Sequence, residues 1–181
     1  AELRLPLLGA FNGENALAAV AVGVAAGFGF QASVEALRHF KGVPGRVQRV
    51  AHAGAKTVFV DYAHSPDAFE KVLGTARAAM GRERVGGRLV TVFGCGGERD
   101  RGKRPLMLEA ALRLSDHVFV TTDNPRSEDP AAIAEEVLTG ARAAADRQRV
   151  SVELDRERAI HLALDTTADA EVGPAGCKTF D

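Results

Sequence analysis

The sequence has few of the residues that build metal centres or disulfide frameworks. It contains two cysteines in 181 residues, Cys95 and Cys177, which lie far apart and form no CxxC pair. This excludes a disulfide-rich scaffold and gives no sign of a zinc site. We therefore expect a protein of the reducing cytoplasm and assign it no metal ligand. Metal-ligand spacing is also lacking among His39, His52, His117 and His161.

The sequence also lacks an excess of charge and a run of apolar residues long enough to span a membrane. Lys and Arg number 23 against 24 Asp and Glu, so no broad basic surface for a nucleic-acid backbone is expected. The apolar run 16–30 has 15 residues, fewer than the roughly 20 that cross a bilayer. No basic region precedes it, as one would in a secretory signal. We expect a buried helix there, and neither a nucleic-acid nor a membrane partner.

The composition is that of an ordinary globular protein. Hydrophobic residues make up 46% and charged residues 26%, which favours a packed core over disorder. The length fits one domain, or one domain with a piece of another. The opening residues, AELRLPLLGAFNGEN, look like the middle of a domain. We therefore expect the chain to be a fragment of a longer protein.

From residue 56 onward, apolar strand patterns alternate with helical patterns. Strands are expected in 56–64, 88–97, 117–126 and 149–154, and helices in 65–80, 104–115, 128–145 and 155–164. The strand patterns are continuously apolar, as in strands buried on both faces. This predicts an α/β fold with a mostly parallel sheet. Before it, helices in 12–28 and 33–40 lead to a glycine- and proline-containing linker, KGVPGRVQRV. The expected domains are therefore 1–43 and 44–181.

Polar residues gather where three of these strands end. The first strand ends in Asp61, Tyr62 and His64, the second in GCGGERDRGKR and the third in DNPR. In open α/β sheets ligands bind beyond the carboxyl ends of the strands, so a binding site is expected there. Asp61 and His64 fit either an acid/base pair or a turn followed by a helix start. The sequence alone leaves both open.

The glycine-rich segment 94–104 fits an anion site, although a solvated loop remains an alternative. It is not a phosphate-binding P-loop, because GxxxxGK[ST] is absent. A nucleophilic role for Cys95 is disfavoured, because no His/Asn arrangement supports it. In DNPR, turn chemistry explains the first three residues but not Arg126. A guanidinium there fits a carboxylate, and Asp123 beside it fits an ammonium group.

These motifs resemble the Mur ligases of peptidoglycan synthesis. The similarity rests on GAFNGENALAA (9–19), VPGR (43–46), DYAHSPD (61–67), VFGCGGERDRGKRP (92–105) and DNPR (123–126), in that order. It extends over about residues 8–164 and is strongest to the members that add meso-diaminopimelate. The resemblance implies that 44–181 is a Rossmann-like C-terminal domain that binds the amino acid. It also implies that 1–43 is the end of the central ATP-binding domain.

The resemblance further implies a reaction and its site. ATP, with Mg²⁺, phosphorylates the D-glutamate carboxylate of UDP-N-acetylmuramoyl-L-alanyl-D-glutamate, and the amine of diaminopimelate attacks the acyl phosphate. The nucleotide would contact Asn12, Asn15, Arg46, Asp61 and His64. Diaminopimelate would contact Arg99, Asp123, Asn124 and Arg126. Lysine-adding relatives replace this last arginine, in keeping with its reading a second carboxylate. A monomer is expected.

The chain departs from the family pattern in two ways. It contains neither the N-terminal UDP-binding domain nor the phosphate loop of the central domain, so we expect the chain alone to be inactive. In place of an apolar strand and a GKGHE motif, residues 165–181 read DTTADAEVGPAGCKTFD. We expect an altered end without that strand, and carry no role onto Gly173, Gly176 or Lys178. A cyanophycin-synthetase-like amide ligase and a non-catalytic α/β binding module remain alternative functions.

Overall fold

The structure is a computed structural model that describes residues 5, 7–50, 56–83, 87–166 and 171–176. The chain divides into two compact units, Ala1–Pro44 and Gly45–Asp181. The first unit contains the two expected helices, α1 (Ala10–Ala25) and α2 (Phe30–Arg38). They pack closely at Gly23, where an added Cβ would lie 2.6 Å from the Ser33 hydroxyl.

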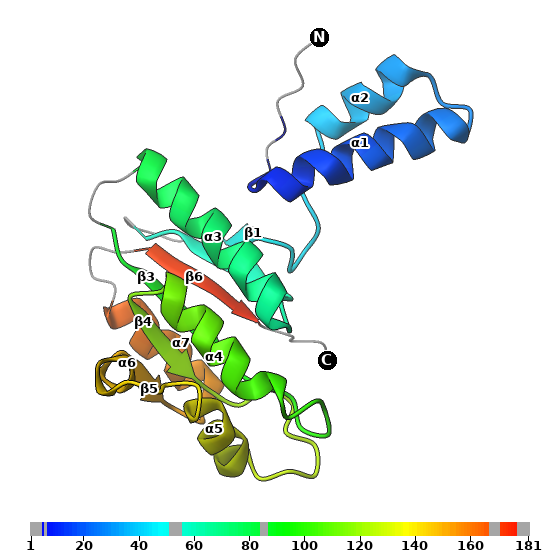
Figure 1. The fold of residues 1–181 in the computed structure, drawn as a ribbon. Coiled ribbons are helices and arrows are strands. Elements are labelled where there is room, and N and C mark those ends of the chain that lie inside the picture. The colour runs from blue at the N-terminus through cyan, green and yellow to red at the C-terminus, as the bar shows by residue number, and fades with distance from the viewer. Residues whose placement is uncertain (1–4, 6, 51–55, 84–86, 167–170, 177–181) are drawn as a thin grey trace. The chain divides into compact units, whose positions relative to one another are not determined.

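The second unit is built around a six-stranded sheet (Figure 1). Its strands are β1 (Gln48–Val50), β2 (Val58–Asp61), β3 (Leu89–Phe93), β4 (His117–Val120), β5 (Val150–Val152) and β6 (Glu171–Gly176). The order across the sheet is β1-β2-β6-β3-β4-β5. Every pairing is parallel except that of β1 with β2. The predicted α/β fold with a mostly parallel sheet is confirmed.

Helices cover both faces of this sheet. They are α3 (Pro66–Glu83), α4 (Lys103–Leu114), α5 (Pro130–Leu138), α6 (Ala144–Gln148) and α7 (Arg156–Thr166). The larger core lies on the face of α3, α4 and α5, and includes Phe93 and Val118. The smaller core packs α7 against Val90 and Phe119. Burial on two faces explains why β3 and β4 are predominantly apolar. The edge strand β5 is only partly buried, unlike the expectation for a strand covered on both faces.

Two helix starts form as their sequences predict. Asp129 accepts a hydrogen bond from the Ala131 amide at 3.1 Å, with Pro130 at the first helical position of α5. Ser65 makes the corresponding bond to the Ala68 amide at 3.4 Å before α3. The helices α3 and α5 therefore begin directly after the polar segments that follow β2 and β4, and they anchor those segments at the edge of the sheet.

Two expectations about local structure are wrong. The segment 128–145 is not one helix: α5 ends at Leu138, and α6 begins only at Ala144 and continues to Gln148, because the chain turns at Gly140. There the backbone lies so close to α4 that an added Cβ would sit 2.2 Å from the Pro105 carbonyl oxygen. The supposed linker also contains a strand, β1, which pairs antiparallel with β2 at the edge of the sheet.

The expectation that no strand follows the last helix is also wrong. Strand β6 lies between β2 and β3 and pairs in parallel with both. Glycine and proline are depleted in strands, so the segment EVGPAG carries no local strand signal. The pairing of β2 with β6 is irregular between Val58 and Val60. Gly173 and Gly176 belong to β6, whereas Lys178 lies outside the described residues.

Among the described helices, none combines the length and apolar character needed to cross a membrane.

Candidate functional site

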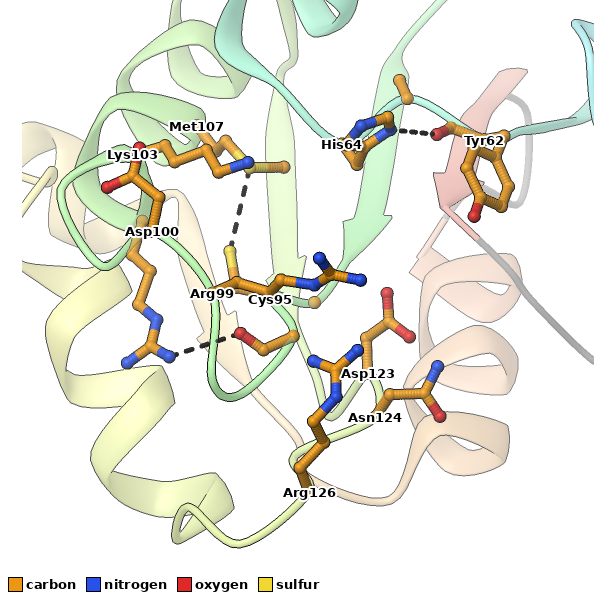
Figure 2. A pocket seen from close by; sticks show the side chains of 14 residues that line it. Tyr62, His64, Cys95, Arg99, Asp100, Lys103, Met107, Asp123, Asn124 and Arg126 are labelled. Atoms are coloured by element: carbon orange, nitrogen blue, oxygen red, sulfur yellow. Dashed lines mark hydrogen bonds between the residues drawn. The ribbon is translucent and has the colours of Figure 1, made fainter.

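A pocket of about 270 Å³ opens where β2, β3 and β4 end (Figure 2). Three segments line it: the turn after β2, the loop and helix start after β3, and the loop after β4. The lining residues are Tyr62, Ala63, His64, Gly94, Cys95, Gly96, Arg99, Asp100, Lys103, Arg104, Met107, Asp123, Asn124 and Arg126. The expected location of a binding site, at the carboxyl ends of the strands, agrees with this pocket.

Two loops form the pocket floor, and glycine lets them approach closely. The first is the loop 94–102 after β3, called here the GCGG loop. The second is the loop 121–129 after β4, called the DNPR loop. A Cβ added to Gly94 would lie 2.4 Å from the Thr121 carbonyl oxygen, and one added to Gly97 would lie 1.8 Å from that of Pro125. Only glycine fits at these contacts, so the close packing of the two loops requires glycine at positions 94 and 97.

The DNPR loop holds its polar residues in an uncommon backbone conformation. Asn124 and Arg126 have φ of 43° and 53°, in the left-handed region. Asparagine adopts this region readily, but arginine rarely does, and such residues cluster at functional sites. The Gly97 amide donates to the Asn124 carbonyl at 3.1 Å, and Arg126 Nη1 donates to the Gly97 carbonyl. The GCGG loop therefore fixes the direction of the arginine that turn chemistry left unexplained.

Positive charge dominates the pocket. Arg99 and Arg126 extend their guanidinium groups toward the side chain of Asp123 from different loops (Figure 2). Within the described ranges, the side chains of Arg99 and Lys103 form no hydrogen bond or ion pair. Asp100 instead accepts a hydrogen bond from the Gly102 amide at 3.0 Å. The pocket therefore presents cations that fit anionic groups of a ligand.

Cys95 lies in the pocket wall, and its side chain is buried. Its sulfur lies 3.9 Å from the Met107 sulfur. Burial raises the pKa of the Cys95 thiol to about 12, which outweighs the opposite effect of Arg104. The thiol therefore stays protonated at neutral pH, and the geometry does not support a nucleophilic role for Cys95.

The structure brings five of the nine expected site residues to the pocket, and these are His64, Arg99, Asp123, Asn124 and Arg126. The other four do not line it. Asn12 and Asn15 lie on α1 in the first unit. There Asn12 donates to the Leu8 carbonyl at 2.7 Å.

Arg46 and Asp61 lie next to the turn that carries His64. The Arg46 guanidinium is 5.3 Å from the centre of the Tyr62 ring, a cation–π distance. Asp61 is 4% exposed, and its carboxylate accepts the amides of Val47 and Ala63, each at 2.7 Å. Of the two roles left open for Asp61, the geometry therefore favours the turn. His64 instead contacts the Tyr62 carbonyl at 3.2 Å.

The sequence alone missed other pocket residues, chiefly Lys103 and the buried Arg104. Both belong to the charged run after GCGG. The composition of that run indicated an anion site, but it did not indicate which of its residues line the pocket. The carboxylates that hold Arg104 come from Glu128 and Glu136, which are 24 and 32 residues away. No local pattern reveals such a distant pairing.

Comparison with known proteins identifies the second unit. Residues 45–172 match the family described as "Mur ligase, glutamate ligase domain". The UDP-N-acetylmuramoyl-L-alanyl-D-glutamate–2,6-diaminopimelate ligase of Parasynechococcus marenigrum is 48% identical over 172 residues, 92% of this chain and 33% of that protein. The protein of the same name from Geobacter sulfurreducens is 52% identical over 134 residues, 74% of this chain and 25% of that protein. The chain thus spans about a third of the length of such relatives.

Solved structures give the same result. A UDP-N-acetylmuramoyl-L-alanyl-D-glutamate–2,6-diaminopimelate ligase superposes with a TM-score of 0.66 at 41% identity, covering 96% of this chain and 34% of that one. A folylpolyglutamate synthase of Mycobacterium tuberculosis, complexed with ADP and AMPPCP, superposes with a TM-score of 0.74 at 26% identity. It covers 97% of this chain and 39% of that one.

Proposed function

Since this chain belongs to the Mur ligase family and carries its glutamate ligase domain, we propose that it is part of a diaminopimelate-adding ligase. The complete protein would use ATP to join meso-diaminopimelate to UDP-N-acetylmuramoyl-L-alanyl-D-glutamate. The carboxylate of D-glutamate accepts the terminal phosphoryl group of ATP, and ADP leaves. The diaminopimelate amine then attacks the acyl carbon, forming the amide and releasing phosphate.

The pocket chemistry carries this proposal. Each end of diaminopimelate carries one ammonium and one carboxylate group, so its binding site needs anionic and cationic side chains together. Arg126 and Arg99 fit the carboxylates, and Asp123 fits an ammonium group. Asn124 adds an amide on the same loop. The names of the similar proteins also favour this substrate over that of a cyanophycin-synthetase-like ligase.

The remaining site residues are proposed to act on the nucleotide side. His64 would contact phosphate groups, and Arg46 would reach the ribose or phosphates. Asp61 would contribute by holding the turn between them, since its two oxygens already accept backbone amides. Asn12 and Asn15 would lie beside the adenine, and residues 1–43 would be the end of the ATP-binding domain. The compartment would be the cytoplasm, and the protein a monomer.

Magnesium is proposed as the ion that bridges the nucleotide phosphates. Proteins commonly hold it with one or two carboxylates and substrate phosphates. Within the described residues, no three His, Cys, Asp or Glu side chains are grouped to hold a metal. We therefore assign the ion no ligand in this chain.

The full-length ligase is expected to form the amide with meso-diaminopimelate and to discriminate against L-lysine, which lacks the second carboxylate. The measurement is ATP-dependent formation of the UDP-tripeptide with each amino acid, followed by chromatography. Omission of the UDP-dipeptide is the control, because ADP should then not accumulate. Equal rates with both amino acids would contradict the proposal.

Lys103 is a further cation of the pocket lining, beyond the two that the carboxylates of diaminopimelate require. We expect it to bind the developing negative charge of the acyl phosphate as the amine attacks. Lys103→Ala should lower kcat about tenfold, or about 1.4 kcal/mol in barrier, with little change in KM for diaminopimelate.

The matched control for Lys103 is Lys71→Ala. Lys71 is exposed on α3 and pairs with Asp67 at 2.9 Å, away from the pocket lining. Steady-state kinetics of both variants check the prediction. An increase in KM for diaminopimelate at unchanged kcat would instead place Lys103 on the amino acid.

A further inference from the structure

Arg104 is a charged side chain that the fold buries almost completely, although it lies at the pocket wall. It is 1% exposed and is the largest fully buried side chain in the described part of the chain. A buried charge is costly unless it is paired and hydrogen-bonded. An ordinary core position would hold an apolar residue, so the arginine needs a reason beyond packing.

Two glutamates and one carbonyl meet this guanidinium. Its Nη atoms donate to both carboxylate oxygens of Glu128, each at 2.9 Å, which is the bidentate arrangement that arginine favours. Nη1 also donates to Glu136 at 2.7 Å, and Nη2 donates to the Gly96 carbonyl at 3.3 Å. Hydrogen bonding from Arg104 lowers the pKa of Glu128 to about 2, so the carboxylate remains charged at neutral pH.

These contacts join the two loops of the pocket floor. Arg104 itself is on α4, Gly96 is in the GCGG loop, Glu128 is in the DNPR loop and Glu136 is on α5. Glu128 also accepts the amide of Glu98, which connects its carboxylate to the GCGG loop a second time. One buried side chain thus holds together the segments that carry Arg99 and Arg126.

The backbone at this junction needs such support. Glu98 has a φ of 51°, so it shares the left-handed conformation of Asn124 and Arg126. Ser127 donates to the Glu98 carboxylate at 2.6 Å, beside the contacts of Glu128. Glutamate and arginine rarely hold this conformation unless their surroundings enforce it. The cluster around Arg104 supplies such contacts at the junction of the two loops.

We propose that Arg104 is a positioning residue for this pocket, which acts through Glu128 to hold the GCGG and DNPR loops together. Arg99 and Arg126 then present their guanidinium groups in a fixed arrangement before the amino acid binds, and less ordering is left for the binding step. This inference rests on the proposed function, because the amino acid in question is diaminopimelate.

Kinetics of two variants in the full-length ligase test the inference. Arg104→Met keeps most of the buried length but removes the charge, and Glu128→Gln keeps the shape of its partner. Both should raise KM for diaminopimelate about tenfold, because the guanidinium groups of Arg99 and Arg126 lose their fixed positions. KM for ATP should stay within about twofold. A merely structural role would lower the amount of active enzyme, and so kcat, without changing KM for one substrate.

Arg101→Ala is the matched control. Arg101 pairs with the same Glu136 but is 68% exposed and does not line the pocket, so its loss should leave both KM values unchanged. Arg104→Lys keeps the charge without the bidentate fork and should give an intermediate KM for diaminopimelate.

Unchanged KM for diaminopimelate in both test variants, or equal increases for both substrates, would overturn the inference. The companion variant Arg126→Ala distinguishes failure of the positioning role of Arg104 from failure of the proposed binding site. If it raises KM for diaminopimelate while the Arg104 and Glu128 variants do not, only the positioning role fails. If it has no effect either, the proposed site itself is wrong.

Discussion

Gly97→Ala is expected to reduce amide formation by the full-length ligase by about 100-fold or more. The new Cβ would lie 1.8 Å from the Pro125 carbonyl oxygen, whereas such contacts essentially never fall under 3.0 Å. The atoms that this Cβ would meet belong to the backbone of Pro125, which cannot move aside as a flexible side chain could, so the GCGG and DNPR loops must separate by about 1 Å or more. Gly97 also accepts from Arg126 and donates to Asn124, so both pocket residues would move with it.

The same substitution should destabilise this chain by about 2 to 3 kcal/mol, as overpacking of a tight contact does. Urea unfolding measures this, and Gly74→Ala is its matched control. Gly74 lies within α3, where an added Cβ meets nothing within 4 Å. Alanine there should raise stability by about 0.5 to 1 kcal/mol, because glycine is unfavourable inside a helix. Similar stabilities for the two variants would contradict the close approach of the loops.

Arg126→Ala in the full-length ligase is expected to raise KM for diaminopimelate by about 30- to 150-fold with little change for ATP. A hydrogen-bonded charge pair of this kind contributes about 2 to 3 kcal/mol. Discrimination between diaminopimelate and lysine should fall by a similar factor, since lysine offers no second carboxylate. Steady-state kinetics with each substrate varied in turn give both quantities.

Alanine at position 126 also changes the backbone preference, so a second variant is needed. Arg126→Asn suits the left-handed conformation of this residue but provides no guanidinium. If the guanidinium is what matters, both variants should raise KM equally. A normal KM in the Arg126→Asn variant would show that the backbone, not the side-chain charge, sets affinity. Equal effects of Arg126→Ala on ATP and diaminopimelate would contradict the assigned site.

The sequence predicted the regular parts of this fold well, because periodicity and capping act locally. Helix α5 begins at Asp129 and Pro130 as its cap predicts, and the predominantly apolar strands β3 and β4 lie inside the sheet. Strand β6 escaped prediction because its position depends on partners on both sides and not on its own residues. Likewise, the turn at Gly140 reflects contact with Pro105, which lies 35 residues earlier.

The site was predictable in location but not in geometry. Parallel strands bring their carboxyl ends together, so the residues after β2, β3 and β4 could be expected to meet. The direction of Arg126 depends on a left-handed backbone and on the Gly97 carbonyl, which lies 29 residues away. The use of both Asp61 oxygens by backbone amides was equally hidden, since one of the donors is Val47.

The position of β6 has a consequence for the way the chain is made. Within the described part of the sheet, strands β2 and β3 do not pair with one another; both pair with β6, which is translated last of the six. While the chain emerges from a ribosome, the turn that carries His64 therefore has no sheet contact with the loops that carry Arg99 and Arg126. Strands β1 and β2 and the β3-β4-β5 portion can pair early, but they join into one sheet only when the final strand inserts between them. Completion of the sheet that carries the pocket is thus a late, long-range event in folding, and such events are slow.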